Sequence, residues 1–493
     1  MSALRHAAAL LVVGFVTAAA IGTAPSVSAA LPAPHPTVSD YQFIAGGTTP
    51  PTEAQCEAVA RTCFTPQAIQ SAYNVGPLYA QGLDGRGITI AIVDSYGSDT
   101  MAHDLHVFDQ AFGVRPMCGE EGVTCVPGMP KFSELAMNGS PPTVAQPGNG
   151  THLEDKSAWA LEVALDVETS HAIAPGANIL LVHSNNAETL GVQGFPQMMK
   201  AEDYVVSHGL AQVISQSFAS AEDAFSTFTS IQNLRFAYIN AAANGVTVLG
   251  SSGDGGSANG TKQPTAKGGA LIPFPSVEWP ASDPLVTGIG GTYLCTDPTA
   301  STSQARTPYV KSGIGGKCGS SVYNPGGVFA EVAWTFSGGG FSHVFAKPTW
   351  QNTLPTDSTP IATMRGVPDV AFQASAGTGA LVYVSLPPDG NGSNVGASLS
   401  GWYDIGGTSL SCPQWAGLVA IADQLNGGGL GLITPRSTRS ARTRRATRTT
   451  SSTSRAATPT RPTPASQAMR RRRAGTRSRV WGRRTRRTSC PTW

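Results

Sequence analysis

The chain has few charged residues and no long apolar run outside its N-terminal end. Only 13% of its 493 residues are Asp, Glu, Lys or Arg, while 56 are glycine, a composition typical of a loop-rich exported protein. After Ile21 no segment has the roughly 20 consecutive apolar residues of a transmembrane helix, which excludes a spanning helix there. The eight cysteines include neither a Cys-x-x-Cys pair nor a Cys/His spacing typical of metal ligands, which argues against a zinc or dithiol site.

Acidic residues are absent after Asp423, and this absence distorts the overall charge. The formal net charge is +2, but the segment 436–487 alone holds 18 arginines. The rest of the chain has 15 basic and 31 acidic residues, a formal charge of −16. The body of the protein is therefore acidic, and we expect neither nucleic acid nor a membrane as a partner.

The N-terminal end predicts export. Arg5 precedes the apolar run 7–21, and small residues end this segment at Ala29, as in a secretory signal peptide. Residues 1–29 are therefore expected to be removed, 30–64 to form a short N-terminal or pro segment, and the protein to be secreted and extracellular. In an exported chain we expect disulfides between cysteines close in sequence, with one buried thiol: Cys56 with Cys63, Cys118 with Cys125, Cys295 with Cys318, and Cys412 as the thiol.

Strand and helix patterns alternate through the body of the chain. The apolar run 88–93 predicts a strand that ends at Asp94. Further strands are expected at 178–182, 211–214 and 246–249, and helices at 65–73, 105–112, 156–171, 198–208 and 231–244. This alternation predicts an α/β fold with a doubly wound, mostly parallel sheet and helices on both faces. Reactive groups are then expected at the carboxyl ends of strands, where Asp94, Ser217 and Asp254 occur.

The turn at Gly406-Gly407-Thr408-Ser409 is a candidate nucleophile site. Two glycines permit a tight turn, and Pro413 followed by an apolar run predicts a helix that starts just after it. Ser409 would then lie near the positive end of the helix dipole, where developing negative charge is stabilised. The alternative is an ordinary Ser/Thr helix cap.

Three carboxylates are candidates for proton transfer. Glu162 and Asp166 are four residues apart on an otherwise apolar helix, so they project from one face, while Glu168 points elsewhere. Two carboxylates held close in a dry site share a proton, which raises one pKa. Asp254 lies in a glycine-rich loop directly after a predicted strand. The alternatives are a solvated acidic face for the pair and a turn-forming role for Asp254.

Taken in order, these segments resemble the sedolisin family of serine-carboxyl peptidases, which has a subtilisin-like fold and acts in acid. The resemblance rests on Glu162-x-x-x-Asp166, Ser215-x-Ser217, Ser252-Gly253-Asp254 and Gly407-Thr408-Ser409. Framework segments at 174–177, 334–342, 348–351 and 368–370 add to it. The similarity extends over about 65–432, which we expect to be the peptidase domain.

The resemblance implies roles for particular residues. Ser409 would be the nucleophile, Glu162 its general base, Asp166 the group that orients Glu162, and Asp254 the oxyanion-hole donor. Substrate binding is implied for seven residues: Ser215, Ser217, Phe218, Ala219, Ser337, Gly338 and Gly339. Ala219 stands where the family usually has glycine, so its methyl group narrows the expected cleft.

The implied activity is endopeptidase cleavage of polypeptides through an acyl-enzyme, by a monomer, in acid. A histidine base, with an ordinary pKa of about 6.5, would be protonated near pH 4, whereas a carboxylate would still accept the serine proton. An alternative is a conventional Asp/His/Ser subtilase that uses Asp94, His152 and Ser409. A third interpretation is a catalytically impaired exported protein on a peptidase scaffold.

The segment 433–493 contains mostly Arg, Thr, Ser, Pro and Ala, which predicts a disordered tail. A shifted reading frame permits an Asp-Ile-Thr and a Gly-Trp-Asp segment that resemble the calcium site of the family. We therefore hypothesise a frameshift near 432–436. No metal ligand is assigned in the chain as written, because the calcium site that the resemblance implies would be lost with this segment. The short pro segment likewise departs from the long inhibitory propeptide of the family.

Overall fold

The computed structural model describes residues 35–36, 38–137, 153–184, 194–260, 270–298, 331–353, 363–386 and 399–434. Its centre is an eight-stranded sheet that contains, in spatial order, β11 (Glu331–Ala333), β10 (Thr287–Leu294), β8 (Thr247–Ser251), β6 (Val213–Gln216), β3 (Thr89–Ser95), β5 (Asn178–Ser184) and β4 (Phe132–Ala136). The eighth strand, β14 (Val370–Gln373), also pairs with β10. Every pairing in this sheet is parallel except that of β10 with β11, so the predicted mostly parallel sheet is confirmed.

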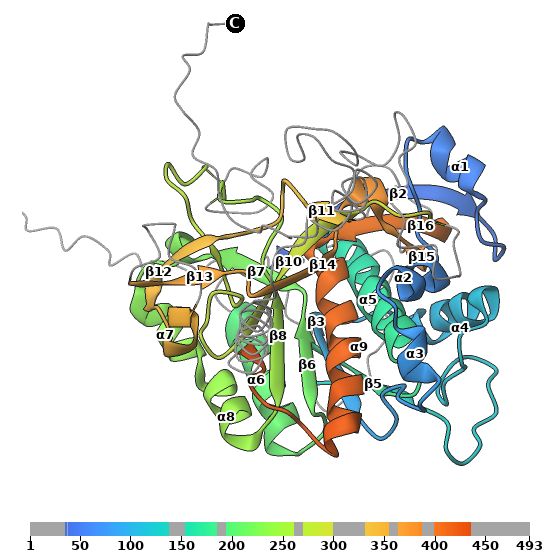
Figure 1. The fold of residues 1–493 in the computed structure, drawn as a ribbon, viewed down its shortest axis with the longest axis horizontal. Coiled ribbons are helices and arrows are strands. Elements are labelled where there is room, and N and C mark those ends of the chain that lie inside the picture. The colour runs from blue at the N-terminus through green and yellow to red at the C-terminus, as the bar shows by residue number, and fades with distance from the viewer. Residues whose placement is uncertain are drawn as a thin grey trace, which may run out of the picture.

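Helices cover both faces of this sheet, as predicted. Alternate residues of β3 face opposite sides: Ile90 and Ile92 pack with one apolar core, and Ala91 and Val93 pack with another. The first core is completed by α5 (Leu153–Ile173) and α9 (Thr408–Asn426), which lie side by side in Figure 1. The second is completed by α6 (Gly194–Ser207), α7 (Phe228–Leu234) and α8 (Phe236–Asn244).

A second, antiparallel sheet supports the helix that carries Ser409. It contains β15 (Ala380–Leu386), β16 (Leu399–Gly407) and β2 (Val38–Gly46), in that order. Strand β16 continues directly into α9. Because β2 pairs with β16 from Gly46 opposite Gly401 to Val38 opposite Gly407, the N-terminal segment is part of the support of this turn (Figure 1).

Short elements complete the described fold. The strands β1 (His35–Pro36), β7 (Phe218–Ala221) and β9 (Glu278–Trp279) form a three-stranded sheet, and β12 (Gly340–Ala346) pairs with β13 (Met364–Val367). Four further helices are α1 (Glu53–Ala58), α2 (Pro66–Ala72), α3 (Gly76–Tyr79) and α4 (Met101–Phe112). As the sequence predicts, Thr65 caps α2 by accepting a hydrogen bond from the backbone of Ala68, with Pro66 at the first helical position.

Two of the predicted disulfides are present, Cys56–Cys63 and Cys118–Cys125, and each closes a loop of seven residues. Cys412 is a buried free thiol, as expected. Cys295 is also disulfide-bonded, while its predicted partner Cys318 lies outside the described residues. The predicted signal segment 1–29 and all but the first two residues of the predicted tail 433–493 lie outside them too.

Two predicted element boundaries were wrong. The helix expected at 231–244 is two helices, α7 and α8, separated at Arg235, whose guanidinium group binds the carboxylate of Asp283. The helix expected to start after the turn at Ser409 begins at Thr408, so Pro413 lies inside it. None of the helices in the described part of the chain has the length and apolarity to cross a membrane.

Candidate active site

Ser409 is the second residue of α9 and is fully buried. The preceding turn requires glycine at two positions. Gly407 has φ +131°, a conformation that side chains rarely permit, and a Cβ on Gly406 would collide with the backbone of Ala376. Because Pro413 has no N–H, the carbonyl group of Ser409 lacks the usual donor four residues later in the helix. The start of α9 is thus shaped by the glycines before Ser409 and the proline after it.

Glu162 lies on α5 and faces Ser409. Its side chain is fully buried, and burial raises its pKa well above the ordinary value. The nearby carboxyl group of Asp94 raises this pKa further, the hydroxyl group of Ser409 opposes the rise, and Asp254 adds to it. Among the described residues, neither oxygen of Glu162 has a hydrogen bond of good geometry, although the Ser409 hydroxyl lies close enough to lower its pKa. The Ser409 hydroxyl and the Glu162 carboxyl group are therefore neighbours, as predicted.

Asp166 lies one helical turn after Glu162, and it is also fully buried. Its Oδ1 atom accepts a hydrogen bond from the Ser217 hydroxyl at 3.0 Å. Burial raises its pKa well above the ordinary value, and the carboxyl groups of Asp94 and Glu162 raise it further. Glu168 instead accepts a hydrogen bond from the backbone of Tyr383 at 3.0 Å, so it faces β15 and not the site, as the helical spacing predicts.

Asp254 follows β8 in the loop that contacts the start of α9. Its Oδ1 atom accepts hydrogen bonds from the Thr408 backbone N–H at 2.7 Å and from the Thr408 hydroxyl at 2.9 Å. The residue immediately before Ser409 therefore fixes Asp254 in place. The structure brings all four predicted catalytic residues together from α5, the loop after β8 and the start of α9.

Sequence reasoning missed the role of Asp94 in this cluster. It had placed Asp94 at the reactive edge of the sheet but gave it a catalytic role only in the alternative Asp/His/Ser arrangement, whose His152 lies outside the described residues. Asp94 is the next-to-last residue of β3, is fully buried, and raises the pKa values of both Glu162 and Asp166. Burial raises its own pKa to about 8. Its position near the end of a buried parallel strand, at the edge where Asp254 also lies, was recognised in the sequence, but its contact with the acids of α5 was not.

The predicted substrate-binding residues lie in two groups. Phe218 and Ala219 belong to β7, while the hydroxyl of Ser215 points at the buried Cys412 thiol, 3.4 Å away. Ser337 accepts a hydrogen bond from the backbone of Gly291 at 2.8 Å. Gly338 and Gly339 lie close to the backbone of other segments. A Cβ on Gly338 would collide with the carbonyl group of Ser252, and a Cβ on Gly339 would lie 3.1 Å from the carbonyl oxygen of Val367.

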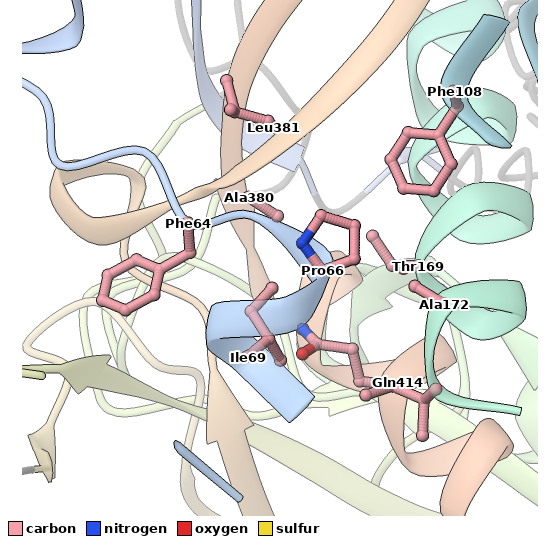
Figure 2. A pocket seen from close by; sticks show the side chains of 10 residues that line it. Phe64, Pro66, Ile69, Phe108, Thr169, Ala172, Ala380, Leu381 and Gln414 are labelled. Carbon is pink, nitrogen blue, oxygen red and sulfur yellow. The ribbon is translucent and has the colours of Figure 1, made fainter. Parts of the chain in front are cut away.

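A small apolar cavity lies between α2, α5 and β15 (Figure 2). Its lining includes Phe64, Ile69, Ala172, Leu381 and Gln414, and none of its ten residues is a predicted site residue. Gln414 from α9 and Thr169 from α5 supply its polar side chains, and the other lining residues are apolar. It is therefore a packing defect of the core and not the substrate cleft.

Among the residues that the structure describes, no group of three or more His, Cys, Asp or Glu side chains is arranged to hold a metal ion. The segment in which the resemblance implies calcium ligands belongs to 435–493, outside these residues.

Comparison with known proteins identifies relatives. No protein-family model matches the chain. It is 29% identical over 392 residues to kumamolisin from Bacillus sp. (strain MN-32), and this match covers 78% of the chain and 56% of kumamolisin. It is 31% identical over 284 residues to sedolisin from Pseudomonas sp. (strain 101), and this match covers 57% of the chain and 41% of sedolisin. Tripeptidyl-peptidase 1 from Bos taurus is 30% identical over 282 residues, 54% of this chain and 39% of that relative.

The solved structures give the same result for the fold. Pseudomonas sedolisin, described as a serine-carboxyl proteinase complexed with two molecules of pseudo-iodotyrostatin, matches with a TM-score of 0.52 and 24% identity. The match covers 77% of this chain and 85% of that structure. The chain spans about half of the length of the curated relatives it matches. Kumamolisin, sedolisin and tripeptidyl-peptidase 1 are thus homologues of the chain, and its fold matches the subtilisin-like α/β fold of sedolisin.

Proposed function

We propose that the chain is a secreted serine-type endopeptidase that cleaves polypeptides in acid by means of Ser409, Glu162, Asp166 and Asp254. The observation that carries the proposal is the arrangement around Ser409: its hydroxyl group faces a buried carboxyl group, and Asp254 is tied to the residue before it. The peptidase homologues support the reaction class.

The first step is proton transfer within the buried pair. Glu162 in its carboxylate form accepts the proton of the Ser409 hydroxyl while the serine oxygen attacks the scissile carbonyl carbon. Burial and the neighbouring acids raise the pKa of Glu162, which makes its carboxylate a stronger base than an exposed one. Asp166, held by Ser217, lies one turn away and shares the negative charge and protons of the pair.

The second step needs a donor for the oxyanion. Asp254 can donate a hydrogen bond to it only in the protonated form, which acid pH favours. Glu162 then returns its proton to the leaving amine, the acyl group remains on Ser409, and a water molecule activated by Glu162 releases it. The mechanism requires one carboxyl group ionised and another protonated at the same pH, which explains why an acid optimum is expected.

One segment of the chain itself pairs with β7 in the way expected of an extended substrate. The segment His35–Pro36 pairs antiparallel with β7, with His35 opposite Ala219 and Pro36 opposite Phe218. An extended peptide thus adds to the edge of β7 through main-chain hydrogen bonds. This pairing supports the assignment of Phe218 and Ala219 to substrate binding, because the backbone of both residues pairs there with an extended segment.

The test is hydrolysis of a denatured protein between pH 3 and 8 by the full chain and four variants. Ser409→Ala and Glu162→Gln should abolish an acid-only activity. Glu168→Gln, on the same helix but facing β15, is the matched control and should retain it. A neutral optimum that His152→Ala abolishes would instead support the Asp/His/Ser alternative, and a folded chain without activity at any pH would support the impaired scaffold.

A further inference from the structure

Thr408, the residue immediately before Ser409, makes three hydrogen bonds with the Asp254 loop. The backbone N–H and the hydroxyl group of Thr408 both donate to the same oxygen of Asp254, Oδ1, at 2.7 and 2.9 Å. The hydroxyl oxygen in turn accepts the backbone N–H of Gly253 at 3.0 Å. Thr408 is fully buried, so water does not compete for these bonds.

These bonds fix the direction of the Thr408 hydroxyl hydrogen. A hydroxyl group has one hydrogen to donate and lone pairs to accept with. Because the oxygen of Thr408 accepts the hydrogen of Gly253, its own hydrogen is left to point at Asp254 Oδ1. Two donors then converge on Oδ1, so a proton on that oxygen would face two other hydrogens. The favourable place for the acid proton of Asp254 is therefore Oδ2.

We propose that Thr408 is a positioning residue. Its hydroxyl group places the acid proton of Asp254 on Oδ2, so that Asp254 presents an O–H donor to the oxyanion. This inference rests on the proposed function of Asp254 as the oxyanion donor. Without the hydroxyl group, Oδ1 of Asp254 would keep one donor, the backbone N–H of Thr408, and the N–H of Gly253 would lose its acceptor. The hydroxyl group therefore completes the arrangement.

Two acidic side chains face Asp254. Glu162 approaches from α5, and Glu278 from β9, where it packs so closely on Gly253 that a Cβ there would collide with its carboxyl group. Burial raises the pKa of Glu278 to about 8, and Asp254 adds to that rise. Both neighbours are acids, and each opposes a second negative charge nearby. The charge of Asp254 raises the pKa of both neighbours. Once acid pH has placed a proton on Asp254, Thr408 decides which oxygen carries it.

The kinetic test compares Thr408→Val, which keeps the shape without the hydroxyl group, with Thr408→Ser, which keeps the hydroxyl group. Deletion of a whole oxyanion donor costs about 10²–10³ in kcat, so we expect about a tenfold loss in Thr408→Val with KM little changed. Since the lost donor stabilised the charged form of Asp254 most, the alkaline limb of kcat/KM should move to higher pH. Thr408→Ser should restore both. Equal behaviour of the two variants, or a loss of kcat without movement of the limb, would overturn the proposal.

A second measurement needs no turnover and separates this inference from the proposed function. The infrared carbonyl band of protonated Asp254 is identified in the full chain at pH 4 by its disappearance in Asp254→Asn. Removal of one donor from Oδ1 should raise the frequency of this band in Thr408→Val and, if that variant does not fold, in Thr408→Ala, but not in Thr408→Ser. No such band at pH 4, or a band that does not move, refutes the proposal even if the enzyme is active. If the band shifts in Thr408→Val but the wild-type chain is inactive, only the proposed function is refuted.

Discussion

Replacement of Asp94 by asparagine should stabilise the protein at neutral pH. Asp94 is fully buried beside Glu162 and Asp166, and neither of its oxygens has a hydrogen-bond partner among the described residues. Burial raises its pKa from 3.8 to about 8, so the folded state binds its proton up to that pH. The unfolded chain releases the same proton near pH 4. The stabilising effect of this proton is complete below pH 4 and is lost as the pH rises through 8.

The magnitude follows from the difference in bound protons. Between pH 4 and pH 8 the folded state holds up to one more proton at Asp94 than the unfolded state, which lowers the free energy of unfolding by about 1.4 kcal/mol for each unit that the pH rises. From pH 4 to pH 7 this amounts to about 4 kcal/mol, an upper bound because Glu162 and Asp166 share protons with Asp94. An asparagine side chain is neutral at every pH, so the Asp94→Asn protein avoids this loss.

The assay is urea unfolding at pH 4, 5, 6 and 7, with the free energy of unfolding obtained at each pH. The wild type and Asp94→Asn should be nearly equal at pH 4 and should diverge by about 2–4 kcal/mol at pH 7, with the variant the more stable. Glu121→Gln is the matched control, because the Glu121 side chain is 64% exposed and its replacement should leave the slope unchanged. Parallel curves for wild type and Asp94→Asn would refute the reasoning.

Two further predictions test single contacts. Ser217→Ala removes the donor to Asp166 Oδ1, and since hydrogen bonds to charged groups contribute about 1.5–3 kcal/mol, kcat should fall about tenfold; an unchanged pH–rate profile would contradict this. Arg365→Met leaves the buried carboxylate of Asp369 without its two bonds of 2.6 Å, and should lower the free energy of unfolding by about 3–5 kcal/mol in urea. The double variant Arg365→Met/Asp369→Leu should recover most of that loss, and failure to do so would mean that the packing of Arg365, not the charge of Asp369, matters.

The sequence was sufficient to predict the local features of the site. The helix α5 is apolar on most sides, which made Glu162 and Asp166 identifiable as buried acids, and both are fully buried. The glycines before Ser409 predicted the tight turn, and the turn has the φ value that requires glycine. These predictions succeeded because each depends on residues within about two helical turns of one another.

Features that depend on distant pairing could not be predicted in this way. Asp94 and Glu162 are brought together by the order of strands in the sheet, and no local pattern encodes which strand lies beneath α5. The pairing of β2 with β16 joins residues more than 350 positions apart in the chain. The start of α9 was misplaced because Pro413 usually marks a first turn, whereas here the hydrogen bonds of Thr408 with Asp254 and Gly253 organise an earlier start.

The two disulfides of known pairing have a practical consequence. Each links cysteines only seven positions apart, one at α1 and one in the loop that leads to β4, while the predicted catalytic side chains lie on α5, α9 and the loop after β8. A short crosslink restricts the unfolded chain less than a long one does. Since Cys125 is exposed while Cys56 and Cys63 are buried, mild reductants should open the Cys118–Cys125 loop first and leave Ser409 and its neighbouring acids in register. Such treatment would suit purification schemes that need a thiol-containing buffer.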